Sequence, residues 1–184
     1  MTVISLATVP NWLDFLVMQP DEERAVVRDI VFGVLAFNAH GRGAPLQVSF
    51  PLYTDPKVET RGMLGPCVRV TGPAEKLYVL TLRHEVSSHL RAGRAMTLVR
   101  ERAVVDAGRN ERFDLLGKGA ANDDASVRPL VVSGHSRLIE AARRLGATVR
   151  DEAVLVTRTE SRIATDGAVD LLGFSDRKTV PVLR

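Results

Sequence analysis

The sequence predicts an α+β protein, and three observations lead to that fold class. Up to residue 106 the predicted elements run strand, helix, strand, strand, helix, strand, which is the order of a ferredoxin-like (RRM-like) domain. Residues 107–126 are polar and contain several glycines, which predicts a linker or hinge. Residues 127–184 then predict a smaller C-terminal α/β segment that carries one arginine-rich helix.

The first predicted strand covers residues 2–9, because this stretch is rich in β-branched side chains and stops at Pro10. Residues 11–18 are predicted to form a short apolar connector that packs on the core. A long helix is then predicted between Pro20 and Gly41, since proline suits the first helical position and glycine suits a C-terminal end.

The apolar residues of this helix recur at steps of three and four, which predicts one buried face made of Val27, Ile30, Val31, Val34 and Leu35. The opposite side carries Asp29, Gly33, Ala36 and His40. His40 is therefore predicted to point outward in the last helical turn.

Residues 46–53 alternate apolar and polar side chains and contain Pro51, which cannot donate a ladder hydrogen bond. They predict a strand near a sheet edge. The remaining predicted elements are strands at 66–71, 96–105, 127–132, 153–159, 163–175 and 180–183, helices at 74–82 and 84–90 that end at Gly93, and a helix at 137–145.

With 184 residues, 45% of them hydrophobic, the chain is long enough to bury a core. No apolar run reaches the length of a membrane span and the N-terminus lacks the pattern of a signal peptide, so a cytoplasmic protein is expected. The single Cys67 excludes an internal disulfide and is expected to be buried. The four histidines are scattered and no Walker loop or dinucleotide fingerprint is present, so neither a metal nor another cofactor is expected.

Arginine dominates the basic residues, since only four of the 25 Lys and Arg side chains are lysines. The planar guanidinium suits phosphates and guanine edges, so this bias indicates a nucleic-acid partner. The alternative is a genome rich in G and C, which favours arginine codons whatever the function. On the helix at 137–145, Arg137 and Arg144 share a face that Arg143 flanks. That face suits either phosphate contacts or an ordinary solvated surface with Glu140 as ion-pair partner.

His40 is the histidine best placed for chemistry. An outward imidazole at a helix C-terminus could act as a general base or acid in phosphodiester cleavage, because imidazole exchanges protons near neutral pH. The alternative is a histidine that only interacts with the negative end of the helix.

Three motifs resemble the CRISPR-associated repeat-processing endoribonucleases of subtype I-F, including those associated with transposons. They are the helix segment VFGVLAFN at 31–38, the run Val48-Ser49-Phe50-Pro51-Leu52 followed by Asp55 and Val58, and the ending Leu172-Gly173-Phe174-Ser175 with Val180-Pro181-Val182-Leu183. The helix from Arg137 to Arg144 also resembles the arginine-rich helix of that family, which lies along the major groove of a repeat hairpin. The resemblance thus extends over nearly the whole chain.

The resemblance implies an N-terminal ferredoxin-like domain that binds the stem-loop of CRISPR repeat RNA. It implies metal-independent cleavage of precursor CRISPR RNA at the 3′ base of the hairpin, through attack by the adjacent 2′-hydroxyl. The protein then remains on its product, with the other subunits of a surveillance complex as partners. The expected RNA contacts are Arg137, Arg143, Arg144 and Arg150 along the stem, and Arg112 and Lys118 on the hinge.

The family's active-site residues are not all matched in this sequence. The catalytic histidine of the first helix falls at Ala36, and His40 lies one turn further on the same face, where it is expected to substitute as general base. The family's C-terminal tyrosine is matched by Leu172, and Ser161 is the candidate for its serine. Two alternatives follow: a hairpin-binding cap of the effector complex that does not cleave, and an unrelated ferredoxin-like protein-interaction module.

Overall fold

The computed structural model describes residues 11–40, 43–52, 64–98, 105–117, 127–163, 165–175 and 180–183, and of 105–109 and 180–183 it describes only the backbone. The elements of the first part are β1 (Trp12–Val17), the 3-10 helix η1 (Pro20–Glu22), α1 (Glu23–His40), β2 (Gln47–Ser49), β3 (Cys67–Thr71), α2 (Ala74–Leu82), α3 (His84–Arg91) and β4 (Ala95–Leu98). The second part has β5 (Val105–Leu115), β6 (Val127–Val131), α4 (Ser136–Arg144), β7 (Val149–Arg150), β8 (Ala153–Ser161) and β9 (Val180–Leu183).

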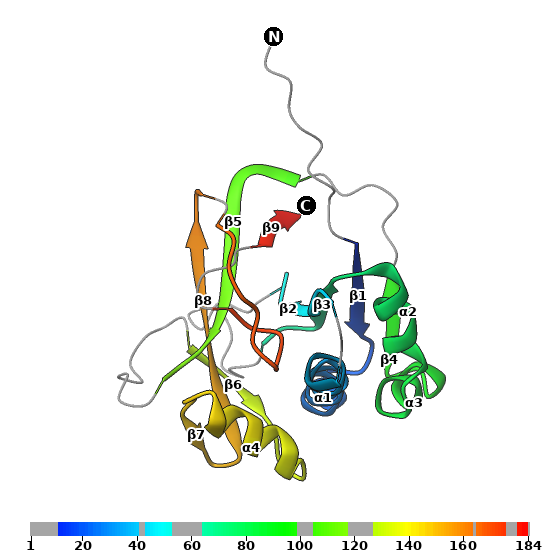
Figure 1. Cartoon of the computed structure of the whole chain (residues 1–184). Helices are drawn as coiled ribbons and strands as arrows, with labels where there is room; N and C mark the ends of the chain where they lie inside the picture. The colour runs from blue at the N-terminus through cyan, green and yellow to red at the C-terminus, as the bar shows by residue number, and fades with distance from the viewer. Residues whose placement is uncertain are drawn as a thin grey trace.

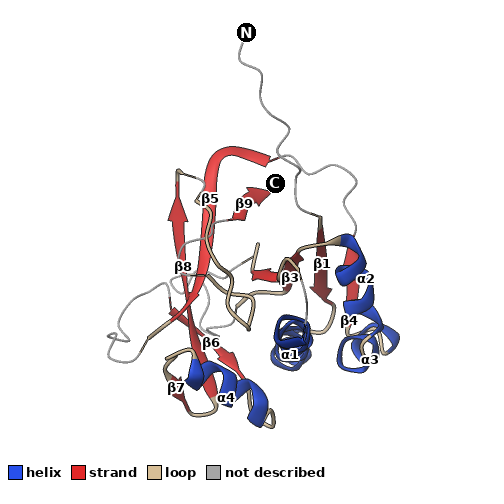
Figure 2. Ribbon diagram, in the orientation of Figure 1, coloured by secondary structure: helices blue, strands red, loops and turns tan. Residues whose placement is uncertain are grey.

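Within the described residues these strands form two antiparallel sheets (Figures 1 and 2). The first sheet has the order β2-β3-β1-β4. The second has the order β6-β8-β5-β9, with the short β7 also paired to β8. Helix α1 lies between the two parts, because it contacts α3 on one side and β6 on the other. The predicted α+β class is confirmed.

Helix α1 lies where the sequence predicts it, and the five apolar residues of its predicted inner face are buried. The prediction for its opposite side is wrong in part. Gly33 is buried there, and a Cβ on it would lie 2.8 Å from Leu80 Cδ1 of α2. Asp29 and Ala36 are half-buried, and only His40 of this set is exposed. Helix α1 is covered on two sides, because α2 and α3 pack against the face that the apolar periodicity of α1 predicts to be exposed.

The first strand of the described chain is β1, within residues 11–18, which the sequence predicted to be a connector. That prediction is wrong, and the predicted strand at residues 2–9 lies outside the described residues. In β1 the side chains of Leu13, Phe15 and Val17 point into the core. Asp14 between them is also buried, because Arg69 of β3 donates two hydrogen bonds to its carboxylate at 2.6 and 2.7 Å. A buried charge inside the strand thus hid its alternating pattern.

Strand β2 is an edge strand, as predicted, although its ladder extends only over Gln47–Ser49. Its open edge is covered by a later segment of the chain, because the Val48 N–H donates to the Gly173 carbonyl at 2.8 Å. The Asn38 side chain donates to the carbonyls of Leu46 and Asp170 at 3.0 and 3.3 Å. The segment 170–175 therefore takes the place of a further strand beside β2.

The strand predicted at residues 163–175, around a turn at 165–167, is wrong for residues 168–175, which form no regular strand. Asp170 organises residues 170–174 as a loop, since its Oδ1 accepts the backbone N–H groups of Leu172 at 2.8 Å and Phe174 at 3.0 Å. Burial and the negative charge of Asp114 raise the pKa of Asp170 to about 6, although the backbone hydrogen bonds act in the opposite direction. A local side-chain cap outweighs the β-propensity of the segment.

Strand β5 occupies residues 107–115 of the segment that the sequence predicted to be a hinge. It pairs with β8 on one side and β9 on the other. Its buried Glu111 is held by Arg158 of β8 at 3.0 Å, so a polar composition is compatible with a central strand here. Residues 118–126 of the predicted hinge, Lys118 among them, lie outside the described residues.

Other elements agree with their predictions, namely β3, α2, α3, β6, α4, β8 and β9. The predicted strand at 96–105 corresponds to β4 up to Leu98, and residue 105 already belongs to β5. Cys67 is buried, as predicted.

One apolar cluster joins the two sheets. The ring centroid of Phe50, directly after β2, lies 5.3 Å from that of Phe113 in β5 and 6.3 Å from that of Phe174. All three rings are buried, and each lies in a different predicted part of the chain or its linker. The two sheets therefore share this apolar cluster. The division of the chain into two domains and a linker, with boundaries at residues 106 and 126, stays a prediction.

Replacing Gly173 by alanine is expected to destabilise the fold more than replacing Gly134. Both glycines have a positive φ, 87° and 77°, so each alanine has a backbone cost of about 1 kcal/mol. At Gly173 a Cβ would also lie 2.8 Å from Val48 Cγ2, whereas nothing lies within 4 Å at Gly134. The additional overpacking is roughly 1–3 kcal/mol. Urea unfolding measures both variants, and equal losses would refute a tight contact with Val48.

The stability of the protein is expected to fall as the pH rises from about 4 to about 6, because the folded state holds the Asp170 proton more tightly than the unfolded chain. The change is on the order of 1–3 kcal/mol. Asp170→Asn keeps an oxygen for the two backbone N–H groups and is expected to remove this pH dependence. Thermal unfolding followed by circular dichroism between pH 4 and 7 tests it. The control is Asp21→Asn, because Asp21 is exposed. If Asp21→Asn changed the pH dependence of stability as much as Asp170→Asn, the assignment to Asp170 would be contradicted.

Candidate functional site

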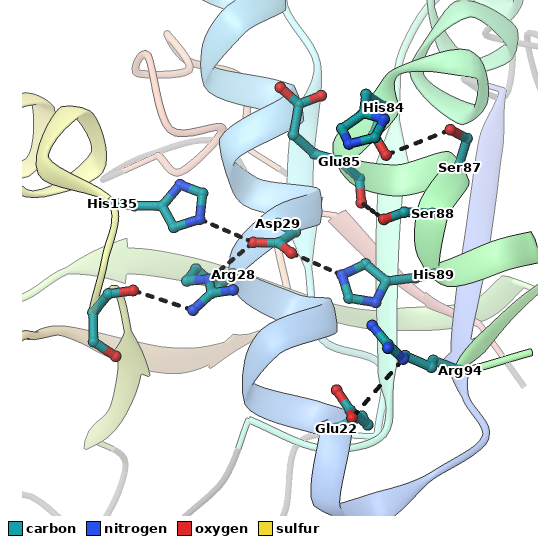
Figure 3. Close-up of polar contacts among 11 residues, drawn as sticks. Glu22, Arg28, Asp29, His84, Glu85, Ser87, Ser88, His89, Arg94 and His135 are labelled. Atoms are coloured by element: carbon teal, nitrogen blue, oxygen red, sulfur yellow. Dashed lines mark hydrogen bonds and ion pairs between the residues drawn. The ribbon is translucent and has the colours of Figure 1, made fainter. Parts of the chain in front are cut away.

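The most elaborate polar cluster of the described residues is centred on Asp29, in the middle of α1 (Figure 3). Its Oδ2 accepts the Nε2–H of His89 at 2.8 Å. Its Oδ1 accepts the Arg28 Nε–H at 2.8 Å and lies 3.2 Å from the Nε2 of His135. One carboxylate thus holds two imidazoles and one guanidinium.

Three separate parts of the fold bring these side chains together. Asp29 and Arg28 belong to α1, His89 to the last turn of α3, and His135 to the residue before α4. Arg28 also donates to the Ser133 carbonyl at 3.1 Å, and the His135 ring meets Phe32 edge to face at 4.9 Å between centroids. The cluster therefore fastens the segment before α4 to the helix layer of the first sheet.

The electrostatics of the cluster keep Asp29 ionised. Burial alone would raise the pKa of Asp29, but the hydrogen bonds and positive charges of Arg28 and His89 outweigh it and lower that pKa below its usual value. Each imidazole uses Nε2 toward Asp29, so Nδ1 is left for another role. The Nδ1 of His89 is buried without a hydrogen-bond partner, whereas the His135 side chain is 22% exposed.

His40, the predicted general base, lies outside this cluster. It is exposed at the end of α1, and its Nδ1–H donates to the Ala36 carbonyl at 3.1 Å, which leaves Nε2 free for a substrate. Eleven residues of helix put it about 16 Å from Asp29 along the axis. No carboxylate holds its ring among the described residues. Its catalytic role stays a prediction.

Ser161 ends β8 in a local turn, where its hydroxyl donates to the Ile163 carbonyl at 2.8 Å and accepts the Ile163 N–H at 3.1 Å. Leu172, at the position of the family's tyrosine, is 1% exposed. No contact between Ser161 and His40 is found in the described part of the chain. The structure therefore does not assemble these sequence-predicted residues into one site.

Four of the five predicted RNA-binding arginines lie on α4 and on the strand that follows it. Arg137 and Arg143 are exposed on α4, and Arg150 is exposed on β7. Arg144 is 74% exposed and forms an ion pair with Glu140 one turn earlier. Arg112 lies apart on β5, half-buried, with its Nε buried and without a partner.

One side of α4 faces an acidic turn. A groove there is lined by Ser136, Ile139, Glu140, Arg143, Val149, Asp151 and Glu152. Asp151 and Glu152 both have a positive φ, 46° and 58°, and form the tight turn between β7 and β8. Arg143 is thus the α4 arginine that lines the groove together with the acidic residues of the turn, and Arg137 and Arg144 do not line it.

Sequence reasoning missed the cluster around Asp29. It placed Asp29 on an outward helix face and treated the histidines as scattered. Sixty residues separate Asp29 from His89, and His135 belongs to the second part of the chain, so no spacing rule connects them. The only available signal was a charged residue inside a strongly apolar helix.

In comparisons with known proteins, no family model and no curated protein matches the chain. Within the described residues, no three or more His, Cys, Asp or Glu side chains are arranged to hold a metal ion. No helix of the described segments has the length and apolar character required to cross a membrane.

Replacing Asp29 by asparagine is expected to lower the unfolding free energy by roughly 1–3 kcal/mol. Arg28, His89 and His135 now share the two carboxylate oxygens, and the NH₂ group of asparagine cannot accept a hydrogen bond from any of them. Since the folded pKa of Asp29 is lowered, its contribution is present above pH 4 and is lost as the pH falls further. Urea unfolding at pH 7 and pH 3 measures both effects. The exposed Asp21→Asn is the control, and an equal loss in both variants would contradict the role of the cluster.

Proposed function

We propose that this protein binds the stem-loop of a CRISPR repeat RNA and cuts the precursor at the 3′ base of the hairpin without a metal ion. It then stays on the product as a subunit of a surveillance complex. The observation that carries the proposal is the group of exposed arginines on α4 and β7: Arg137, Arg143, Arg144 and Arg150.

The first sheet supports a ferredoxin-like (RRM-like) domain as the scaffold. Its order is β2-β3-β1-β4, with α1 between β1 and β2 and with α2 and α3 between β3 and β4. This is the strand and helix sequence of that plan, which recurs in RNA-binding proteins. A fold by itself hosts many functions, so the arginines and not the sheet carry the proposal.

The geometry of α4 suits the backbone of an RNA stem. Arg137 and Arg144 are two turns apart on one face, about 10 Å along the helix axis. Double-stranded RNA is recognised mainly by shape and by contacts to phosphates and 2′-hydroxyls, which needs cations spread along a rigid element. The ion pair of Arg144 with Glu140 is exposed and weak, so a phosphate can replace Glu140.

The residue at position 36 of α1 supports a second candidate, a cap that binds the hairpin without cutting it. The position of the family's histidine is Ala36, whose side chain has no titratable group. A gel assay with labelled repeat RNA in EDTA separates the two. The nuclease releases a product with a 2′,3′-cyclic phosphate, and the cap retains intact RNA.

Hairpin binding is expected to depend steeply on salt and on the α4 arginines. Each of Arg137→Ala and Arg144→Ala should weaken the complex by roughly 1–3 kcal/mol and reduce the salt slope by about one. The matched control is Arg91→Ala, an exposed arginine on α3. Fluorescence anisotropy with the repeat hairpin at several salt concentrations measures this. Equal effects of all three variants, or no binding at all, would sink the proposal.

A further inference from the structure

His135 differs from the other histidines of the described chain in two ways taken together. The largely buried carboxylate of Asp29 lies beside its ring, and its side chain is partly exposed to solvent. Its Nε2 lies 3.2 Å from the Oδ1 of Asp29, and its side chain is 22% exposed. We propose that His135, oriented by Asp29, is the general base that removes the proton from the attacking 2′-hydroxyl. This inference rests on the proposed function and names the group that carries out its cleavage step.

The position of the Asp29 carboxylate beside Nε2 indicates which nitrogen is free, because an ionised carboxylate can only accept a hydrogen bond. With the proton of the neutral ring on Nε2, the lone pair is on Nδ1, and no described residue hydrogen-bonds to that atom. Once the ring takes up a proton, the Asp29 charge stabilises the imidazolium. Asp29 is itself held by Arg28 at 2.8 Å and His89 at 2.8 Å, so the pair is pre-organised. Asp29 acts here as a positioning residue.

The place of His135 in the fold suits an RNA substrate. It directly precedes α4, and the exposed Arg137 lies in the first turn of that helix. The edge-to-face contact with Phe32 holds the ring against α1, one helical turn before Ala36. A phosphate bound by Arg137 would therefore be held by a residue only two positions after this imidazole.

Neither of the two rival histidines has the same combination. His89 donates to the same carboxylate, but its Nδ1 is buried and no substrate atom can reach it. His40 is exposed, but its ring is hydrogen-bonded to the Ala36 carbonyl of its own helix. A neutral carbonyl stabilises an imidazolium less than a charged carboxylate does. Only His135 among these three has both a carboxylate beside its ring and a side chain that is partly exposed.

The proposed cleavage of the RNA strand needs no reagent other than water. The 2′-oxygen gives its proton to Nδ1 of His135 and forms a bond to the adjacent phosphorus, while the bond from phosphorus to the 5′-oxygen breaks. Water protonates the departing 5′-oxygen, and the hydroxide so formed takes the proton back from His135. The products are a 2′,3′-cyclic phosphate and a 5′-hydroxyl.

The test compares the full-length wild-type protein with His135→Gln, His40→Gln and His84→Gln on labelled repeat RNA in EDTA. Glutamine at 135 keeps an N–H for Asp29 but cannot accept a proton. We expect cleavage by His135→Gln to fall at least about 100-fold with unchanged hairpin affinity, which is the usual range for a lost general base. His84 is exposed on α3 and outside the cluster, so His84→Gln should cleave like the wild type.

The outcomes separate the inference from the proposed function. Wild-type cleavage with an equally active His135→Gln, or with a loss in His40→Gln alone, overturns the role of His135 and leaves the nuclease standing. Binding without cleavage by the wild type overturns both the nuclease and this inference but leaves the hairpin cap. No binding overturns the whole proposal.

A second variant keeps the inference testable if His135→Gln does not bind the hairpin. His135→Ala leaves room for free imidazole, which can replace the missing ring. Restoration of cleavage by at least about tenfold on adding imidazole supports the general base. No restoration, with the variant bound to the hairpin, overturns it.

Discussion

The closure of the β2 edge by the segment 170–175 is the constraint on which the arrangement of the two sheets depends. The buried Val48 N–H has its acceptor in Gly173, and a buried backbone donor without an acceptor would be costly. The approach is close enough that Gly173 has no room for a Cβ. The stacked rings of Phe50 and Phe174 and the edge contact with Phe113 then seal the junction against water.

This junction also decides what surrounds α1. With the second sheet held against β2, the segment before α4 comes next to the side of α1 on which Asp29 and Phe32 lie. The first sheet supplies α3 and His89 from the other side. A carboxylate that would be a surface group in an isolated helix comes to lie between two imidazoles, because packing on both sides removes most of it from water.

The cluster and the arginines of α4 are adjacent along the chain, since His135 is the residue before that helix. The contacts that fix His135 therefore also fix the start of the basic helix relative to the first sheet. In the proposed RNA complex, the same element would position the phosphates and the acid–base group. This arrangement offers a physical route by which an alanine at position 36 is compatible with the proposed cleavage, because the imidazole comes from a different element, next to Phe32 of α1.

The sequence by itself determined the long amphipathic α1, the helices α2 to α4, the edge character of β2 and the exposure of the α4 arginines, because these follow from local periodicity and from Gly and Pro at element ends. Only the tertiary structure decided the rest. Asp14 makes β1 a strand through a partner 55 residues away, and Asp170 makes a loop of an apparent strand through its own backbone contacts. The Asp29 cluster needs three distant segments at once, and burial reverses the expected role of Asp29 and Gly33. Long-range burial of charges has no period in the sequence, so local patterns cannot reveal it.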